Sequence, residues 1–184
     1  MDCYQDIRVL PDPEFSTEML MAALFAKLHR ALGQYSSGNI GVSFPRAAKT
    51  PGDLLRLHGT AQVLEIFSQA AWLKGMNDCV QSGPIQAVPL NTPFRCVSRV
   101  QVKSSAERLR RRSVKKGWLS EEEALARIPD NKSQHTDLPF IPMKSLSTGE
   151  HFRLFIRQGE LRPQPAPGEF STYGLSAVAT IPWF

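Results

Sequence analysis

The chain has 184 residues, of which 42% are hydrophobic and 21% charged, so it can bury the core of one domain, or of two small ones, without staples. It contains no apolar run of the roughly 18 residues that a membrane helix needs, which excludes an integral membrane protein. Three separated cysteines, Cys3, Cys79 and Cys96, argue against a disulfide framework and against a cysteine-built zinc site. The acidic start of the sequence lacks the features of a secretion signal, so we expect a cytoplasmic protein.

The positive charge is concentrated in one stretch. The formal net charge is +5, from 22 Lys and Arg against 17 Asp and Glu. Nine of the basic residues lie between Arg95 and Gly117, where Glu107 is the only acid. The remaining 13 basic and 16 acidic residues give the rest of the chain a charge of −3. Such a basic belt is typical of proteins that bind phosphates, and the alternative is a solvated surface segment.

The first half alternates between strand and helix patterns. In chain order it predicts a strand over 3–10, a helix over 16–33, strands over 40–44 and 54–58, a helix after Thr60, and a strand over 85–88. Ser16 is the predicted N-cap of the first helix and Gly33 its C-terminal glycine. Ala71 and Trp72 are expected on the buried side of the second helix. The order favours a ferredoxin-like (RRM-like) βαββαβ domain over residues 1–93, within an α+β protein.

Residues 94–184 predict a smaller α+β domain that binds RNA and carries an arginine-rich helix. Its first strand covers 94–102, and its period of two places Cys96, Ser98, Val100 and Val102 on the buried face. The opposite face then carries Arg95, Val97, Arg99, Gln101 and Lys103. A face with so many cations is not an ordinary solvent face, because neutral or mixed-sign residues would keep it soluble equally well.

A basic helix follows, beginning at a capping box of Ser104 and Glu107 and ending at Gly117. Leu109 and Val114 are its only sizeable apolar residues, too far apart to form a stripe for burial. Like charges repel along such a helix, and a polyanion would remove the repulsion. We therefore expect one side of it to bind anions: Arg108, Arg111, Arg112, Lys115 and Lys116.

The remaining segments predict a short helix and two strands. A second capping box, Ser120 with Glu123, begins a helix that ends at Pro129. Strands are expected over 140–145 and 151–157, the latter with Phe152, Leu154 and Ile156 on one face, before a proline-rich tail.

Four histidines are present, His29, His58, His135 and His151, and none has the spacing of paired metal ligands. His29 is singled out because it lies near the end of the first predicted helix, at the border between its apolar stripe and solvent. There a neutral imidazole can act as a general base for a hydroxyl. The alternative, a structural histidine, stays open at this point. Together with the basic belt and the α+β fold, this histidine indicates an RNA-binding protein, with a nuclease as one candidate.

Several segments together resemble one known family, in order and at matching spacing. They are DIRVLPDPEF, KLHRAL, IGVSFP, SRVQVKSSAERLRRR, LSEEEA with RIPD, STGEHFRLFIRQG, and TYGLS with the final PWF. The chain resembles the CRISPR-associated repeat-processing endoribonuclease of subtype I-F, which acts in antiviral defence. The resemblance implies cleavage of CRISPR precursor RNA at the base of the repeat hairpin, with no metal and no cofactor. A ribose 2′-hydroxyl attacks the phosphate, leaving a 2′,3′-cyclic phosphate and a 5′-hydroxyl.

The resemblance also implies roles for single residues and partners. The catalytic histidine falls on His29, the serine that fixes the ribose on Ser145, and the tyrosine that orients the imidazole on Tyr173. Residues that contact the RNA fall on Arg99 and Gln101, on the helix from Arg108 to Lys116, on Ser147 and Thr148, and on Phe152, which stacks on the closing base pair. The enzyme is expected to stay on the mature crRNA and to join other CRISPR-associated proteins of the I-F surveillance complex.

The residue types agree with part of this assignment on their own. On a strand, Arg99 and Gln101 share a face about 6.6 Å apart, and their side chains form bidentate contacts with G and A edges. Ser145 and Tyr173 have plainer interpretations, as a serine beside a turn and a tyrosine of the core. The alternative function is a hairpin-binding subunit of a CRISPR ribonucleoprotein that does not cleave.

Overall fold

The computed structural model describes residues 1–102, 106–129, 136–145 and 148–184. The chain forms two compact units, one of Met1–Val100 with Leu138–Phe184 and one of Gln101–Asp137. The predicted domain boundary after Pro93 stays a prediction. Lys103, Ser104, His135 and Ser147 lie outside the described residues, and so does the capping box predicted at Ser104.

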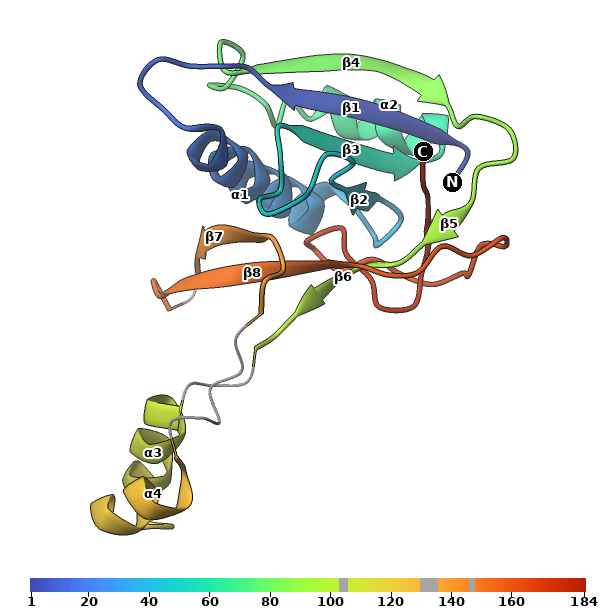
Figure 1. The fold of residues 1–184 in the computed structure, drawn as a ribbon. Coiled ribbons are helices and arrows are strands. Elements are labelled where there is room, and N and C mark those ends of the chain that lie inside the picture. Colours follow the sequence, from blue (N-terminus) through green and yellow to red (C-terminus); the bar gives the residue numbers. More distant parts are fainter. Residues whose placement is uncertain (103–105, 130–135, 146–147) are drawn as a thin grey trace. The chain divides into compact units, whose positions relative to one another are not determined.

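The mixed α+β class is as predicted (Figure 1). The first unit contains β1 (Cys3–Val9), α1 (Thr17–Tyr35), β2 (Gly41–Ser43), β3 (Leu54–Gly59), α2 (Ala61–Gln69), β4 (Val80–Ala87), β5 (Phe94–Arg95), β6 (Val97–Val100), β7 (Phe140–Lys144), β8 (His151–Gln158) and β9 (Ile181–Pro182). The second contains α3 (Ala106–Lys115) and α4 (Glu121–Arg127).

The largest sheet of the described residues has four strands in the order β2-β3-β1-β4, and each neighbouring pair is antiparallel. Ile7 and Leu57 are completely buried on its apolar face, and α2 packs against β1, β3 and β4. The strand predicted over 85–88 starts earlier in the structure, as β4. The strand starts at Val80, because an edge strand tolerates Gly83 and Pro84 at a shift of register, where the sequence reads as a break.

Both helices of this unit have the predicted N-caps, but their ends differ from the predictions. The hydroxyl oxygens of Ser16 and Thr60 each accept a main-chain N–H. Gly33 lies inside α1, because Leu32 is 2% exposed and its burial offsets the cost of a helical glycine, about 1 kcal/mol. The second helix, by contrast, ends earlier than predicted. Helix α2 ends at Gln69, so Ala71, with φ +48°, and Trp72 lie beyond it.

The strand predicted over 94–102 is broken at Cys96. Strand β5 pairs with β9, whereas β6 pairs with β8 in a sheet of order β6-β8-β7. The predicted assignment of faces is wrong: Val97 is buried, and Arg99, which is exposed, lies opposite the buried Ile156, so the face predicted to be cationic is the one on the apolar side of the sheet. Strand β6 ends at Val100, before Gln101.

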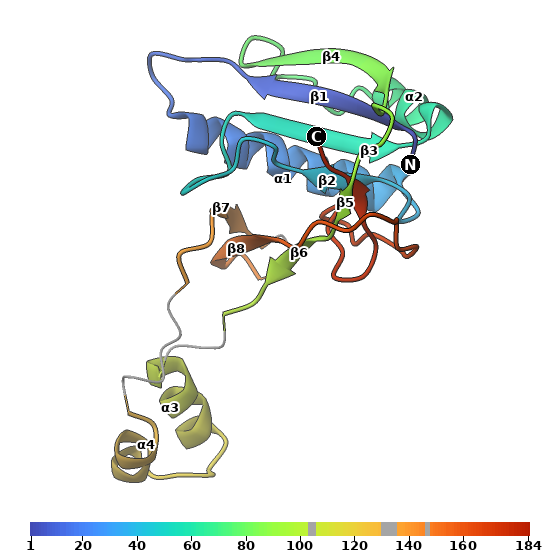
Figure 2. The ribbon, with the colours of Figure 1, turned by 45° about the vertical axis from the view of Figure 1, so that its right-hand side comes forward.

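Helix α1 connects the two sheets. It packs against β1 of the four-stranded sheet and against β7 of the three-stranded sheet (Figure 2). The predicted inward face of β8 is confirmed, since Leu154 and Ile156 are completely buried and Phe152 is half-buried. Residues on α1 are therefore held between two rigid layers.

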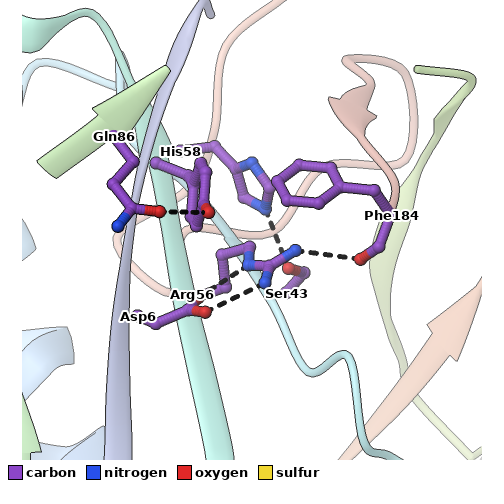
Figure 3. A network of polar contacts seen from close by, with 7 residues as sticks. Asp6, Ser43, Arg56, His58, Gln86 and Phe184 are labelled. Atoms are coloured by element: carbon purple, nitrogen blue, oxygen red, sulfur yellow. Dashed lines mark hydrogen bonds and ion pairs between the residues drawn. The ribbon is translucent and has the colours of Figure 1, made fainter. Parts of the chain in front are cut away.

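Polar contacts tie the C-terminal residues to the four-stranded sheet (Figure 3). Arg56 donates to both carboxylate oxygens of Asp6, at 2.6 and 2.9 Å, and to the main-chain oxygen of Phe184 at 2.9 Å. Its guanidinium carbon lies 4.6 Å from the ring centroid of Tyr4 and 4.1 Å from that of Phe184. This anchoring matters for the site below, which includes part of the same C-terminal segment.

In the second unit, helix α3 ends as predicted. Gly117 has φ +69°, its N–H donates to Val114 O at 2.9 Å, and the Trp118 N–H donates to Ser113 O at 3.0 Å. This is the Schellman arrangement, which glycine favours. The capping box of Ser120 and Glu123 at the start of α4 is confirmed.

Candidate functional site

His29 lies in the last third of α1, half-buried. Its Nδ1 is 2.9 Å from the main-chain oxygen of Thr172. A carbonyl oxygen only accepts hydrogen bonds, so Nδ1 must carry the proton. In the neutral ring, Nε2 then holds the lone pair and can accept a proton.

The ring of Tyr173 stacks on the face of the imidazole, and the ring of Phe25 lies parallel to that of Tyr173. The rings of His29 and Tyr173 stack with centroids 4.1 Å apart and planes 6° apart. The ring of Phe25, which is completely buried, is parallel to that of Tyr173 within 9° at 6.3 Å. The structure therefore brings the predicted pair of His29 and Tyr173 together, with the imidazole fixed by a hydrogen bond and by a ring face.

The loop that carries Thr172 and Tyr173 is fastened at Gly174. The Gly174 N–H donates to Ser171 O at 2.7 Å, and the Val42 N–H of β2 donates to Gly174 O at 2.8 Å. Gly174 has φ +69°, and a Cβ at this position would overlap the Val42 side chain. The close approach of loop and strand thus requires glycine, and it sets the position of the carbonyl that holds His29.

Arg99 extends the site along β6. Its guanidinium carbon lies 5.4 Å from the ring centroid of Tyr173 and 5.2 Å from that of Phe152 on β8. A shallow pocket of about 300 Å³ adjoins this cluster, lined by Arg99, Tyr173 and small hydroxyl residues, among them Ser98 and Ser176. Arg99, Phe152, Tyr173 and His29 thus form one continuous group, with a cation and aromatic faces beside a proton acceptor.

Ser145 and Thr148 belong to the turn after β7, the strand that packs against α1. The Thr148 N–H donates to Ser145 Oγ at 3.3 Å, and the Gly149 N–H donates to Ser145 O at 2.9 Å. Ser147, also predicted to contact RNA, lies outside the described residues. The predicted roles of Ser145 and Thr148 stay predictions.

The basic helix belongs to the second unit. Five exposed side chains, which we call the α3 cations, are those of Arg108, Arg111, Arg112, Lys115 and Lys116. Trp118, which lies just beyond the helix, is 65% exposed, and Lys116 Nζ lies 4.6 Å from its ring centroid. Gln101 is exposed and belongs to this unit as well.

Sequence reasoning missed Thr172, Phe25 and Gly174. Thr172 acts through its main-chain oxygen, which every residue type has, so its identity gives no signal in the sequence. The glycine could have been noticed as a turn residue, but not its contact with β2.

The described residues show neither a metal-binding cluster nor a membrane-spanning helix. None of their His, Cys, Asp and Glu side chains form a group of three or more that could hold a metal ion. No helix in the described ranges is long and apolar enough to cross a membrane.

Comparison with known proteins decides the family. The family model described as CRISPR-associated protein (Cas_Csy4) matches residues 4–184. The chain belongs to the Cas_Csy4 family. A protein of Escherichia coli (strain UTI89 / UPEC) named CRISPR-associated endonuclease Cas6/Csy4 is 60% identical over 184 residues, all of both chains. A protein of the same name from Pseudomonas aeruginosa (strain UCBPP-PA14) is 49% identical over 187 aligned positions, again the whole of both chains.

The family suggested by the sequence is thereby confirmed. The match begins within β1, at Tyr4, and includes every later described element and all of the site residues named above. In this Cas_Csy4 chain, the group around His29 is the strongest candidate for the reacting centre among the described residues, because it combines a fixed, partly exposed proton acceptor with a neighbouring cation and stacking surfaces.

Proposed function

We propose that this Cas_Csy4 chain is a CRISPR endonuclease that cleaves precursor RNA at the base of a repeat hairpin. The observation that carries the proposal is the hydrogen bond from His29 Nδ1 to Thr172 O, at 2.9 Å, beneath the stacked ring of Tyr173. It leaves Nε2 as the proton acceptor of the neutral ring. The names of the two relatives support the same activity.

The proposed reaction is an internal transfer at phosphorus. His29 Nε2 takes the proton of the ribose 2′-hydroxyl while O2′ bonds to the phosphorus. The bond from phosphorus to the departing O5′ breaks, O5′ takes a proton from water, and the imidazolium of His29 releases its proton to solvent. The products are a 2′,3′-cyclic phosphate and a 5′-hydroxyl. General base catalysis of this kind contributes about 10²–10⁴-fold.

The groups around His29 suit this task. The Thr172 carbonyl accepts from Nδ1–H in both protonation states, so the ring keeps its orientation when Nε2 gains the proton. The face of Tyr173 stabilises the resulting cation by electrostatic attraction. Ser145 is proposed to fix the ribose that carries the nucleophile. No metal or cofactor is needed for these steps.

Recognition is divided between the two units. We assign Phe152 to stacking on the closing base pair, and Arg99 and Gln101 to base edges at the accessible end of the stem. A-form RNA hides its major groove elsewhere, so such contacts are possible only near a helix end. The α3 cations supply phosphate contacts, with Ser147 and Thr148 adding further contacts near the cut.

The fold and the partners belong to the same proposal. For residues 1–93 we propose a ferredoxin-like domain, which the strand order β2-β3-β1-β4 and its antiparallel pairing support. After cleavage the protein is expected to keep the mature crRNA in the cytoplasm and to join other CRISPR-associated proteins.

A cleavage assay on repeat RNA tests the function directly. Under single-turnover conditions, His29→Ala should bind the hairpin nearly as tightly as the parent and cut it at least ~100-fold more slowly. Cleavage by the parent should survive EDTA and should be blocked by one 2′-deoxy substitution upstream of the cut. Cutting of the 2′-deoxy RNA would refute the mechanism, and binding without cleavage by the parent would favour the subunit that does not cleave.

A further inference from the structure

A second concave site lies on another part of α1. It is a pocket of about 290 Å³ between the C-terminal half of α1 and the residues that follow α2. Its polar and aromatic lining residues are Lys27, Arg30, Gln34, Tyr35 and Trp72. No carboxylate lines it. None of these residues takes part in the site around His29.

The helical period explains why these side chains gather. Lys27, Arg30 and Gln34 recur at three and four residues, which places them on one face of α1. His29 points about 130° away from the middle of this face, so the pocket and the site around His29 lie on different sides of α1. Lys27 Nζ donates to the main-chain oxygen of Lys74 at 2.7 Å and so ties the turn after α2 to this face.

The polar groups of the pocket are available for a ligand. Within the described parts of the chain, no protein group forms a hydrogen bond or ion pair with the side chains of Arg30, Gln34 or Tyr35. Arg30 is exposed and Tyr35 is 57% exposed, at the end of α1. Trp72 is half-buried and rests on Phe67, with ring centroids 5.5 Å apart.

Cations combined with aromatic faces are the chemistry of single-stranded nucleic acid binding. The backbone meets the cations, and bases stack on the rings without regard to sequence. Arg30 to Gln34 lie within about 8 Å of His29 along the helix axis, at about 1.5 Å per residue. A strand that leaves the reacting phosphate therefore advances only a short way along α1, but it must pass around the helix surface to enter the pocket.

We propose that this pocket binds a nucleotide of the single-stranded RNA that flanks the hairpin. Tyr35 supplies the stacking surface, Arg30 the phosphate contact, and Gln34 an adaptable hydrogen bond. The proposal rests on the proposed function, because it assumes a hairpin held at His29. Either flank offers the same chemistry, the strand before the stem or the strand after the cut.

Binding measurements with matched RNAs test this inference. The RNAs are the repeat stem-loop carrying the 2′-deoxy block, either bare or extended by a few nucleotides on its 5′ side or its 3′ side. For the parent, one extension should tighten binding about 5- to 160-fold, the range of one stacked base. The side that does so identifies the flank. Tyr35→Ala and Arg30→Gln should each remove most of this gain and leave binding of the bare stem-loop unchanged.

Arg162→Gln is the matched control, since it removes the same charge from an exposed arginine elsewhere in the first unit. It should keep the gain. Equal affinity of the parent for bare and extended RNAs would overturn the proposal, and so would equal losses of both variants on the bare stem-loop. Failure of the parent to bind even the bare stem-loop would instead refute the proposed function. A pocket that serves a protein partner gives no gain from either extension.

Discussion

Gly174 offers the most direct test of how the fold positions His29. An alanine there must adopt φ +69°, a left-handed conformation that costs a residue with a Cβ about 1–2 kcal/mol. Its Cβ would also overlap Val42, which is completely buried, and overpacking of this kind costs about 1–3 kcal/mol. If the loop stays in place, the free energy of unfolding of Gly174→Ala should fall by roughly 2–5 kcal/mol. A drop in Tm of about 5–20 °C should follow.

If the loop that carries Gly174 moves instead, the strain is relieved, but the contacts that position His29 are lost. Displacement of Gly174 carries Thr172 O away from His29 Nδ1 and Tyr173 away from the imidazole face. The loss of Tm is then small, and single-turnover cleavage falls by about 100-fold or more while hairpin binding is retained. Thermal unfolding and cleavage measured together separate the two outcomes.

Gly33→Ala is the control for Gly174→Ala. Gly33 faces the same loop, but the nearest atom to its added Cβ is Thr172 Cγ2 at 3.9 Å, an ordinary contact. Because Gly33 lies inside α1, alanine should raise stability by up to about 1 kcal/mol and leave cleavage unchanged. Parent-like stability together with parent-like cleavage in Gly174→Ala would refute the account of the loop given above.

Three further predictions concern other parts of the molecule. Replacing the α3 cations by alanine should flatten the dependence of log K on log salt by roughly one unit for each lost phosphate contact, and an unchanged slope would contradict their assignment. Alanine at Arg99 or Gln101 should cost about 1–3 kcal/mol of binding and relax the preference at one base pair, measured on hairpins with altered closing pairs. His58, whose pKa is lowered to about 3 by complete burial and by the nearby Arg56, should make the protein less stable as the pH falls from about 6.5 toward 3, because only the unfolded state takes up its proton there. Urea unfolding at several pH values should show a weaker dependence for His58→Gln.

Local signals predicted the helix starts well. Ser16, Thr60 and Ser120 each precede an apolar or acidic first turn, and each hydroxyl caps its helix as expected. Such signals depend only on residues adjacent in the sequence, so tertiary contacts rarely shift the start of a helix. Helix ends were predicted less well, since Gly33 is a stop signal that the burial of Leu32 outweighs.

The pairing of strands that are distant in the chain could not be predicted from the sequence, for a physical reason. Alternation through Cys96 assumes one partner along the whole strand, but the chain leaves β9 and joins β8 at that residue. Similarly, Gly83 and Pro84 indicate a turn locally, whereas an edge position and a register shift accommodate them within β4. In both cases the decisive partner lies far away in the chain.

The candidate site shows the same limit at the level of single groups. His29 was singled out because it lies at the border between the apolar stripe of its helix and solvent, and the family resemblance pointed to His29 and to Tyr173. The group that fixes the tautomer of His29 is a main-chain carbonyl, that of Thr172, which any residue could supply. What the chain must specify is the position of that carbonyl, and it does so through Gly174, which approaches Val42 too closely for any residue with a Cβ. The side chains that determine the chemistry of His29 are therefore partly ones that never touch it.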